Sequence, residues 1–201
     1  MMNEKKLILA SGSPRRRELL ETLGTAFTVK TVGTDESHGE MPPEVLVMEL
    51  SGRKAGAVFA SLSEEEAQNA IVVGCDTVVA LDGKILEKPK SETDAFAMLR
   101  ALSGKSHAVC SGLTVRSAEK ELRDCVTTEV CFRELTDEEI SAYIATGEPM
   151  DKAGAYGIQG KACSFVRELH GDYYTVMGMP VCRLTELLRH EFSFDLLKNL
   201  H

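Results

Sequence analysis

The densest group of chemically useful side chains lies in residues 11–17, which read Ser-Gly-Ser-Pro-Arg-Arg-Arg. The apolar run 6–10 predicts a buried strand before it, and Ser13 with Pro14 predicts the N-cap and first position of a helix. A helix N-terminus carries unpaired N–H groups and a partial positive charge, and the hydroxyls of Ser11 and Ser13 add donors. Three arginines there oppose the helix dipole unless an anion lies among them. The segment predicts phosphate binding; the alternative is a solvated charged face with Ser13 as a simple cap.

Three acidic residues are candidates for holding a metal ion. Asp76 interrupts the apolar run 70–80, where an unpaired carboxylate is costly and a metal or a cation is the usual partner. Asp35 and Glu36 lie in the polar loop 33–41, and paired loop acids suit Mg²⁺, which takes few protein carboxylates. The alternatives are a hydrogen-bonded structural aspartate and a solvated loop.

Two turn-rich segments offer further ligand contacts. Lys88 lies in a Glu-Lys-Pro-Lys turn and could neutralise phosphate charge, although such a turn is more often an ordinary surface loop. Residues 151–160 contain three glycines and two alanines, which let a backbone approach a flat ligand closely. Lys152 and Gln159 are the candidate substrate-binding residues there, and the Gln159 amide offers both a donor and an acceptor to a base. A glycine-rich structural turn is the alternative.

Histidines and cysteines show no metal-ligand spacing. The histidines are scattered, so we predict neither a zinc site nor a Ser/His/Asp arrangement. No two cysteines form a CxxC pair, and we expect core thiols at positions 75, 110, 125, 131, 163 and 182.

Composition limits the class of protein. The chain has 201 residues, 43% apolar residues and a formal net charge of −8, which favours one folded domain, whole or divided into two lobes by a cleft. An acidic chain does not attract polyanions, so we expect no binding to nucleic acid or to an anionic membrane. No apolar run approaches a bilayer span, and the run 7–10 is too short for a signal peptide, so we expect a cytoplasmic protein. An anionic ligand must then be small and met by local cations.

Predicted strands and helices alternate, which indicates an α/β fold with a mixed sheet. Strands are expected at 6–10, 27–32, 70–80 and 164–169, and 106–117 with 122–133 as a hairpin. Helices are expected from 14, 42, 91, 136 and 180, each with an apolar stripe.

Taken in order, these segments resemble the Maf family of nucleoside triphosphate pyrophosphatases. The resemblance covers about residues 6–190 and leaves 192–201 outside it. The matching motifs are Leu9–Arg16 with Glu18–Leu20, Gly74–Val79, Lys88-Pro89, Leu102–His107, Asp151–Gly160 and Gly171–Pro180.

The resemblance implies a single domain over 1–201, with a long mixed sheet bent between two lobes around a cleft, similar to the inosine triphosphate pyrophosphatases. It implies hydrolysis of a nucleoside triphosphate to the monophosphate and pyrophosphate with a divalent metal, Mg²⁺ first and Mn²⁺ or Co²⁺ as alternatives. It also implies a homodimer. The segment 151–160 looks like the branch that prefers dTTP and UTP, with sanitation of modified pyrimidine nucleotides as an associated role.

The resemblance also assigns roles to residues. It implies that Ser11, Arg15 and Arg16 hold the triphosphate, that Lys88 neutralises its charge, and that Asp76 binds metal or positions water. The loop carboxylate of the family falls on Asp35 or Glu36. Two other classes stay open: a nucleotide-binding regulatory module that restrains cell division, and a phosphoryl transferase.

Overall fold

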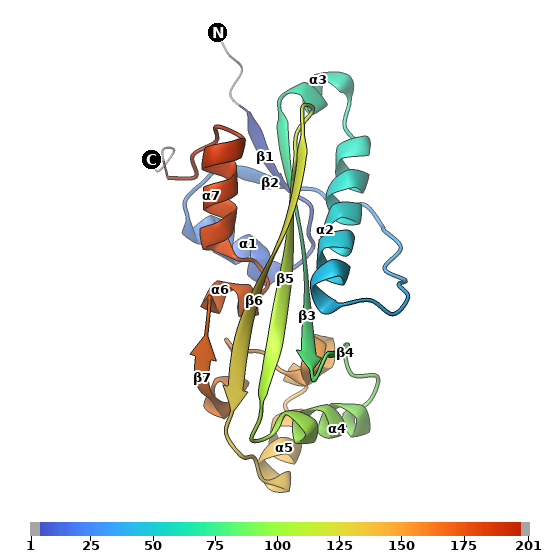
Figure 1. Cartoon of the computed structure of the whole chain (residues 1–201), viewed down its shortest axis with the longest axis vertical. Coiled ribbons are helices and arrows are strands. Elements are labelled where there is room, and N and C mark those ends of the chain that lie inside the picture. The colour runs from blue at the N-terminus through green and yellow to red at the C-terminus, as the bar shows by residue number, and fades with distance from the viewer. Residues whose placement is uncertain (1–4, 198–201) are drawn as a thin grey trace.

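The computed structural model describes residues 5–197, which form one twisted seven-stranded sheet with helices on both faces (Figure 1). The strand order is β2-β1-β3-β5-β6-β7, and β4 pairs with β3 beside this path. The pairs β1–β2 and β1–β3 are parallel, and the other pairs are antiparallel. The predicted α/β class with a mixed sheet is therefore confirmed.

The elements follow the predicted order, with short additions. The strands are β1 Lys6–Leu9, β2 Phe27–Val29, β3 Ala70–Leu81, β4 Lys84–Leu86, β5 Ser106–Arg116, β6 Glu121–Phe132 and β7 Val166–His170. The α-helices are α1 Pro14–Thr22, α2 Pro43–Ala60, α3 Glu64–Gln68, α4 Glu92–Leu102, α5 Asp137–Ile144, α6 Tyr173–Met177 and α7 Val181–Glu191. Three 3₁₀ helices complete the chain: η1 Glu148–Asp151, η2 Ala153–Ala155 and η3 Lys161–Phe165.

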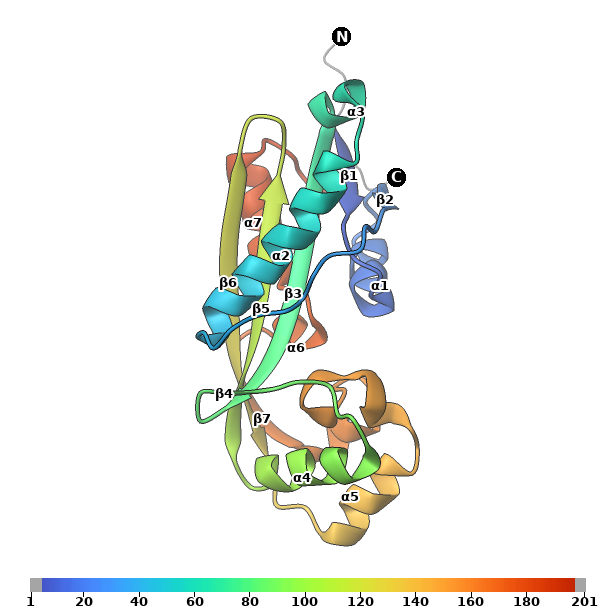
Figure 2. The same ribbon diagram turned by 90° about the vertical axis from the view of Figure 1, so that its right-hand side faces the viewer.

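The long strands β3, β5 and β6 run the length of the molecule and join two lobes (Figure 2). One lobe holds β1, β2, α1, α2 and α7, and the other holds α4, α5 and the 3₁₀ helices. A single core cluster takes buried side chains from both lobes, among them Leu7 and Leu20 from the first and Leu99 and Ile140 from the second. The lobes therefore share one hydrophobic core.

Helix α2 lies unusually close to the sheet because glycines face it. A Cβ at Gly74 would overlap the Ser51 carbonyl oxygen, and a Cβ at Gly112 would overlap the Val47 carbonyl. Gly112 is the register partner of Asp76 on β3. The close approach therefore brings the side chains of α2 within reach of Asp76.

The cysteines divide between the core and the surface. Cys75, Cys110 and Cys131 are buried and Cys125 is partly buried, as expected of core thiols. Cys163 and Cys182 are exposed, so the expectation of core thiols is wrong for these two. The reason is local. Cys163 lies in the short 3₁₀ helix η3, and Cys182 lies on the side of α7 that faces away from the core.

The segment after α7 belongs to the fold, although it lies outside the matched motifs. Phe192, Phe194 and Leu196 are buried in the main core, and the Thr25 hydroxyl donates a hydrogen bond to the Leu196 carbonyl. Residues 198–201 of the predicted extension lie outside the described residues. Among the described residues, no helix is both long and apolar enough to cross a membrane.

The burial of Leu196 gives a direct test of this role. Leu196→Ala should lower the free energy of unfolding by about 2–5 kcal/mol, the cost of a cavity at a fully buried leucine. The neighbouring Leu197 is 54% exposed, so Leu197→Ala should change it by less than about 0.5 kcal/mol. Urea denaturation of both variants makes the comparison, and equal effects would contradict the described packing.

Candidate active site

The two lobes enclose a cleft with a volume of about 1240 Å³. It opens along β3, because β1 pairs with β3 only as far as Val73 and β4 pairs with it from Val79. Within residues 5–197, the edge of β3 between these points has no strand partner, and Asp76 lies at its middle. The cleft brings together all the predicted site residues except Asp35: Ser11, Ser13, Arg15, Arg16, Glu36, Asp76, Lys88, Lys152 and Gln159.

The N-terminus of α1 faces this cleft with its donors free. Ser13 occupies the N-cap position, but its side chain makes no capping hydrogen bond, and the first turn contains no acidic residue. Ser11 is buried, and its Oγ accepts a hydrogen bond from the Ser13 N–H at 3.3 Å. The turn thus offers N–H groups and a positive dipole end to an anion in the cleft.

Arg16 ties this turn to the rest of the cleft wall. Its Nε donates to the Gly178 carbonyl at 2.7 Å. Its two terminal nitrogens donate to Ser11 Oγ at 3.1 Å and to Thr77 Oγ1 at 3.2 Å. Thr77 also hydrogen-bonds to Ser111 at 2.7 Å. The guanidinium of Arg16 is therefore held in one orientation by protein acceptors.

The other two arginines of the run differ in their surroundings. Arg15 lines the cleft and makes no side-chain hydrogen bond within residues 5–197. Arg17 pairs with Glu21 at 2.7 Å on the exposed side of α1 and does not line the cleft. The expectation that all three arginines surround an anion is thus wrong for Arg17, because successive helix positions point about 100° apart.

Asp76 is paired with a residue that the sequence did not single out. Its carboxylate accepts a hydrogen bond from the ammonium of Lys54, a residue of α2. The same ammonium lies 2.8 Å from Glu36 Oε1. The Asp76 side chain is 13% exposed and that of Lys54 19%, so the pair is largely shielded from water. Lys54 holds the two carboxylates toward each other across the cleft.

The charges around Glu36 act on its ionisation. The hydrogen bond from Lys54, with smaller contributions from Lys88 and Arg16, holds the pKa of the Glu36 carboxyl below its usual value. Lys88 reaches this position from the loop between β4 and α4. Glu36 is therefore ionised across the neutral pH range.

Asp35 is placed apart from the cleft. Its carboxylate accepts hydrogen bonds from the Ser37 N–H at 2.8 Å and the Ser37 hydroxyl at 2.7 Å, and these bonds lower its pKa. Its backbone carbonyl is held by Arg53, and the residue borders a separate shallow pocket. Of the two loop acids considered, only Glu36 lines the cleft.

The glycine-rich residues 151–160 form the far end of the cleft. Gln159 is exposed and lines the cleft, and Glu148 holds the segment in place. The Glu148 carboxylate accepts hydrogen bonds from the Tyr143 hydroxyl at 2.9 Å and the Lys161 N–H at 3.1 Å. A Cβ at Gly160 would overlap this carboxylate, so any larger residue there would have to displace the Glu148 side chain.

Lys152 shares this support. Its ammonium donates to the Glu148 carbonyl at 2.7 Å and to Asp151 Oδ1 at 2.6 Å, and its side chain is mostly buried. Lys152 is therefore held in a fixed position at the cleft wall, where Asp151 balances its charge.

The acids of the cleft fit a hard divalent cation. Asp76 and Glu36 both approach one ammonium, so their oxygens converge on one region of the cleft. Mg²⁺ prefers such oxygen donors, and it is usually held by one or two carboxylates plus phosphates of the substrate. The donor set therefore fits the metal that the resemblance implies.

Comparison with known proteins decides the family. The profile described as Maf-like protein matches residues 6–191 of this chain. The chain belongs to the Maf family. The similar curated proteins named dTTP/UTP pyrophosphatase include that of Bacillus cereus, which is 47% identical over 96% of this chain and 93% of its own length. That of Bacillus cytotoxicus is 49% identical over 92% of this chain and 95% of its own length. That of Photorhabdus laumondii is 48% identical over 94% of this chain and 95% of its own length. The Staphylococcus aureus Ham1 protein aligns in structure with a TM-score of 0.43 and 14% identity, over 63% of this chain and 72% of that chain.

In this Maf protein, Lys54 is the main site residue that sequence reasoning missed. A signal for it was present in the run of small residues around it, which includes Gly52, Ala55 and Gly56. Small residues on a helix permit close packing on a sheet, and a lysine among them can then reach a buried acid. The signal could be read only together with Gly74 and Gly112, whose lack of side chains permits the contact.

Proposed function

We propose that this Maf protein hydrolyses nucleoside triphosphates, dTTP and UTP in the first place, to the nucleoside monophosphate and pyrophosphate. The observation that carries the proposal is the cleft itself. It is lined by an uncapped helix N-terminus with a free arginine at one end, the Asp76–Lys54–Glu36 group at the middle of β3, and the Gln159 amide at the other end. The curated relatives that carry the name dTTP/UTP pyrophosphatase support the same activity.

The triphosphate binds at the N-terminus of α1. The free N–H groups of the first turn and the guanidinium of Arg15 contact its oxygens, and Lys88 adds positive charge from the opposite wall. Arg16 holds the turn in shape through Ser11 and Thr77 rather than offering all its donors to substrate. Binding in this way aligns the α-phosphorus with Asp76.

Hydrolysis then needs an attacking water, a place for its proton and stabilisation of the leaving group. Asp76 positions the water and takes its proton while the oxygen bonds to the α-phosphorus. The bond from the α-phosphorus to the bridging oxygen breaks, and pyrophosphate leaves with its charge facing Arg15 and Lys88. A divalent ion, Mg²⁺ first with Mn²⁺ or Co²⁺ as alternatives, would be held by Asp76 and Glu36 and would neutralise phosphate oxygens.

The test is a screen of the common nucleoside triphosphates and modified pyrimidine triphosphates for release of pyrophosphate, with Mg²⁺ and with a chelator. We expect pyrophosphate and monophosphate from dTTP and UTP, and loss of release without the metal. Binding of dTTP without release would favour a regulatory module, and release of orthophosphate or transfer to an acceptor would favour a transferase. Either result would overturn the proposal.

The role of Arg15 has a matched control in its neighbour. Arg15→Ala should raise KM for dTTP about 10-fold or more, because a charge-assisted hydrogen bond to phosphate is lost. Arg17→Ala removes an equal charge from the exposed side of α1 and should leave KM within about twofold. Steady-state kinetics of both variants decides, and unchanged constants in Arg15→Ala would remove it from the phosphate site.

Gln159 is proposed to contact the base. Gln159→Ala should therefore reduce the discrimination among bases, measured as the ratio of kcat/KM for dTTP and dCTP, by about 10-fold while turnover persists. Gln68, at the end of α3 and outside the cleft, provides the control Gln68→Ala. An unchanged ratio in Gln159→Ala would place the base elsewhere.

The homodimer, the cytoplasmic location and the sanitation role stay predictions.

A further inference from the structure

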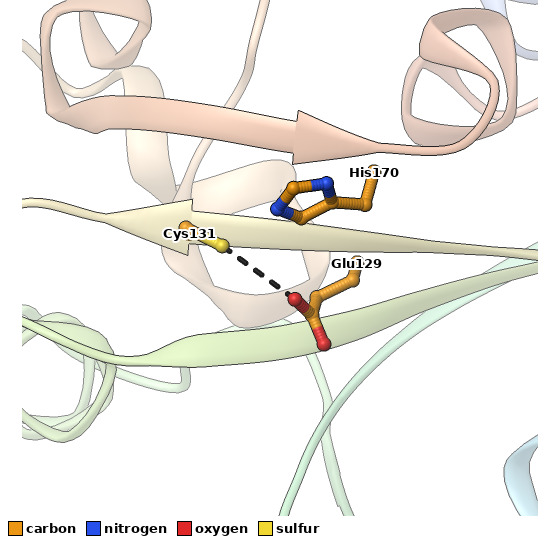
Figure 3. A group of neighbouring side chains, drawn as sticks. All are labelled: Glu129, Cys131 and His170. Carbon is orange, nitrogen blue, oxygen red and sulfur yellow. Dashed lines mark hydrogen bonds between the residues drawn. The ribbon is translucent and has the colours of Figure 1, made fainter.

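Four side chains of different chemistry face one another across the ladder between β6 and β7. Glu129 is directly opposite His170, and Cys131 is directly opposite Glu168. Alternate residues of a strand share one face of a sheet, so the four lie on the same face as a two-by-two group. Figure 3 shows the Glu129, Cys131 and His170 side chains turned toward one another.

The distances suit a common metal ion. One ligand atom each from Glu129, Cys131 and His170 lies within 4.8 Å of the others. Cys131 Sγ is 3.7 Å from Glu129 Oε1, close to the edge of about 3.5 Å expected between a sulfur and an oxygen on tetrahedral zinc. Glu168 Oε2 lies 3.3 Å from His170 Nε2, which places a second carboxylate beside the three.

The position in the fold leaves this group accessible. On β6, Arg123 and Cys125 point to the face that α2 covers, and Glu129 and Cys131 follow on the same face. Glu129 and His170 are exposed, while Cys131 is only 4% exposed. The intervening Val130 is fully buried in the core on the other face. The group therefore has a fixed thiol at its base and an open side toward solvent.

Charges on an edge strand are often explained as protection against pairing with another chain. That explanation accounts for Glu168 and His170 on β7, but not for a nearly buried thiol beneath an imidazole and a carboxylate. Thiolate and imidazole ligands select zinc-like ions over Mg²⁺. None of the four residues lines the cleft, whose acids offer only oxygen.

We propose that Glu129, Cys131 and His170 form a site for a zinc-class transition metal, separate from the catalytic cleft. The fourth position is filled by Glu168 or by water. The ion ties the edge strand β7 to β6, just before the segment that leads through α6 to Gly178 and its hydrogen bond to Arg16. Because Cys131 and His170 are far apart in the sequence, no spacing motif predicts this site. The register between β6 and β7 brings its residues together.

Cobalt(II) added to the full-length protein provides the test, because cobalt bound to a thiolate has a charge-transfer absorption that cobalt bound to oxygen alone lacks. With Mg²⁺ in excess to occupy the oxygen ligands of the cleft, we expect this absorption to saturate at one cobalt ion per chain and to be displaced by zinc. Cys131→Ser should abolish it, whereas Cys163→Ser, which removes an exposed thiol elsewhere, should leave it unchanged.

His170→Ala provides a second variant at an exposed position, where folding is not at risk. It should weaken cobalt affinity by at least about 10-fold while leaving the melting temperature of the metal-free protein within about 2 °C. Absence of the charge-transfer band in the wild-type protein would overturn the proposal. So would a band that survives in Cys131→Ser or an affinity unaltered in His170→Ala. None of these readouts depends on hydrolysis, so they are independent of the proposed function.

Discussion

Asp76→Asn should reduce kcat for pyrophosphate release by at least about 100-fold, the scale of a lost electrostatic group in an active site. The amide keeps the size of the side chain but can neither take a proton from water nor offer a charged oxygen to a metal. It can still accept the hydrogen bond from Lys54, so the fold should persist. Pyrophosphate release and circular dichroism measured on the same preparation test both statements.

Asp82 provides the matched control for this substitution. It lies in the turn between β3 and β4, outside the cleft, with a φ of 51° that asparagine adopts readily. Asp82→Asn should leave kcat within about twofold. A folded Asp76→Asn protein with wild-type turnover would remove Asp76 from the reaction, whatever else lines the cleft.

Lys54→Met should reduce kcat/KM by about 100-fold, because it removes the cation between Asp76 and Glu36. Methionine retains an unbranched apolar stem, so the packing of α2 on the sheet should change little. Without the ammonium, the two carboxylates face each other with only the smaller influence of Lys88 and Arg16 on Glu36. Steady-state kinetics with dTTP measures the loss, and Lys84→Met, at the exposed first position of β4, is the control.

The same variant should shift the pH profile in a defined direction. The hydrogen bond from Lys54 is the largest of the effects that lower the pKa of Glu36. Its removal lets this pKa rise toward the usual value, so a higher pH is needed to keep the carboxylate ionised. The acid limb of kcat/KM should therefore move to higher pH in Lys54→Met. A limb that stays in place would show that the ionisation of Glu36 does not set it.

Much of the fold could be predicted because the relevant signals are local. The apolar run 70–80 around Asp76 favours a strand almost regardless of context. The segments 106–117 and 122–133, which are rich in β-branched residues, favour a hairpin in the same way. Ser13 and Pro14 likewise mark the start of α1, where the structure begins it. Short elements such as β4, α3 and α6 were not predicted, since their few residues carry too little periodicity.

The site was less predictable, because it depends on directions that neighbours in the sequence do not share. Asp35 and Glu36 are adjacent and chemically alike, yet only Glu36 faces the cleft, since Ser37 binds the carboxylate of Asp35. Arg15 and Arg17 differ in the same way. In each case a step of one or two residues along the backbone turns a side chain of the same kind away from the cleft.

By itself, the sequence determined which residue types are available and in which elements they lie: donors and cations at a helix start, an acid in a buried strand, and an amide in a glycine-rich turn. Only the tertiary structure decided which of them meet. Lys54 reaches Asp76 because Gly74 and Gly112 let α2 lie close to the sheet. His170 reaches Cys131 because two strands pair in one register. Contacts between distant segments are set by packing and strand register, and these are properties of the whole chain rather than of any local pattern.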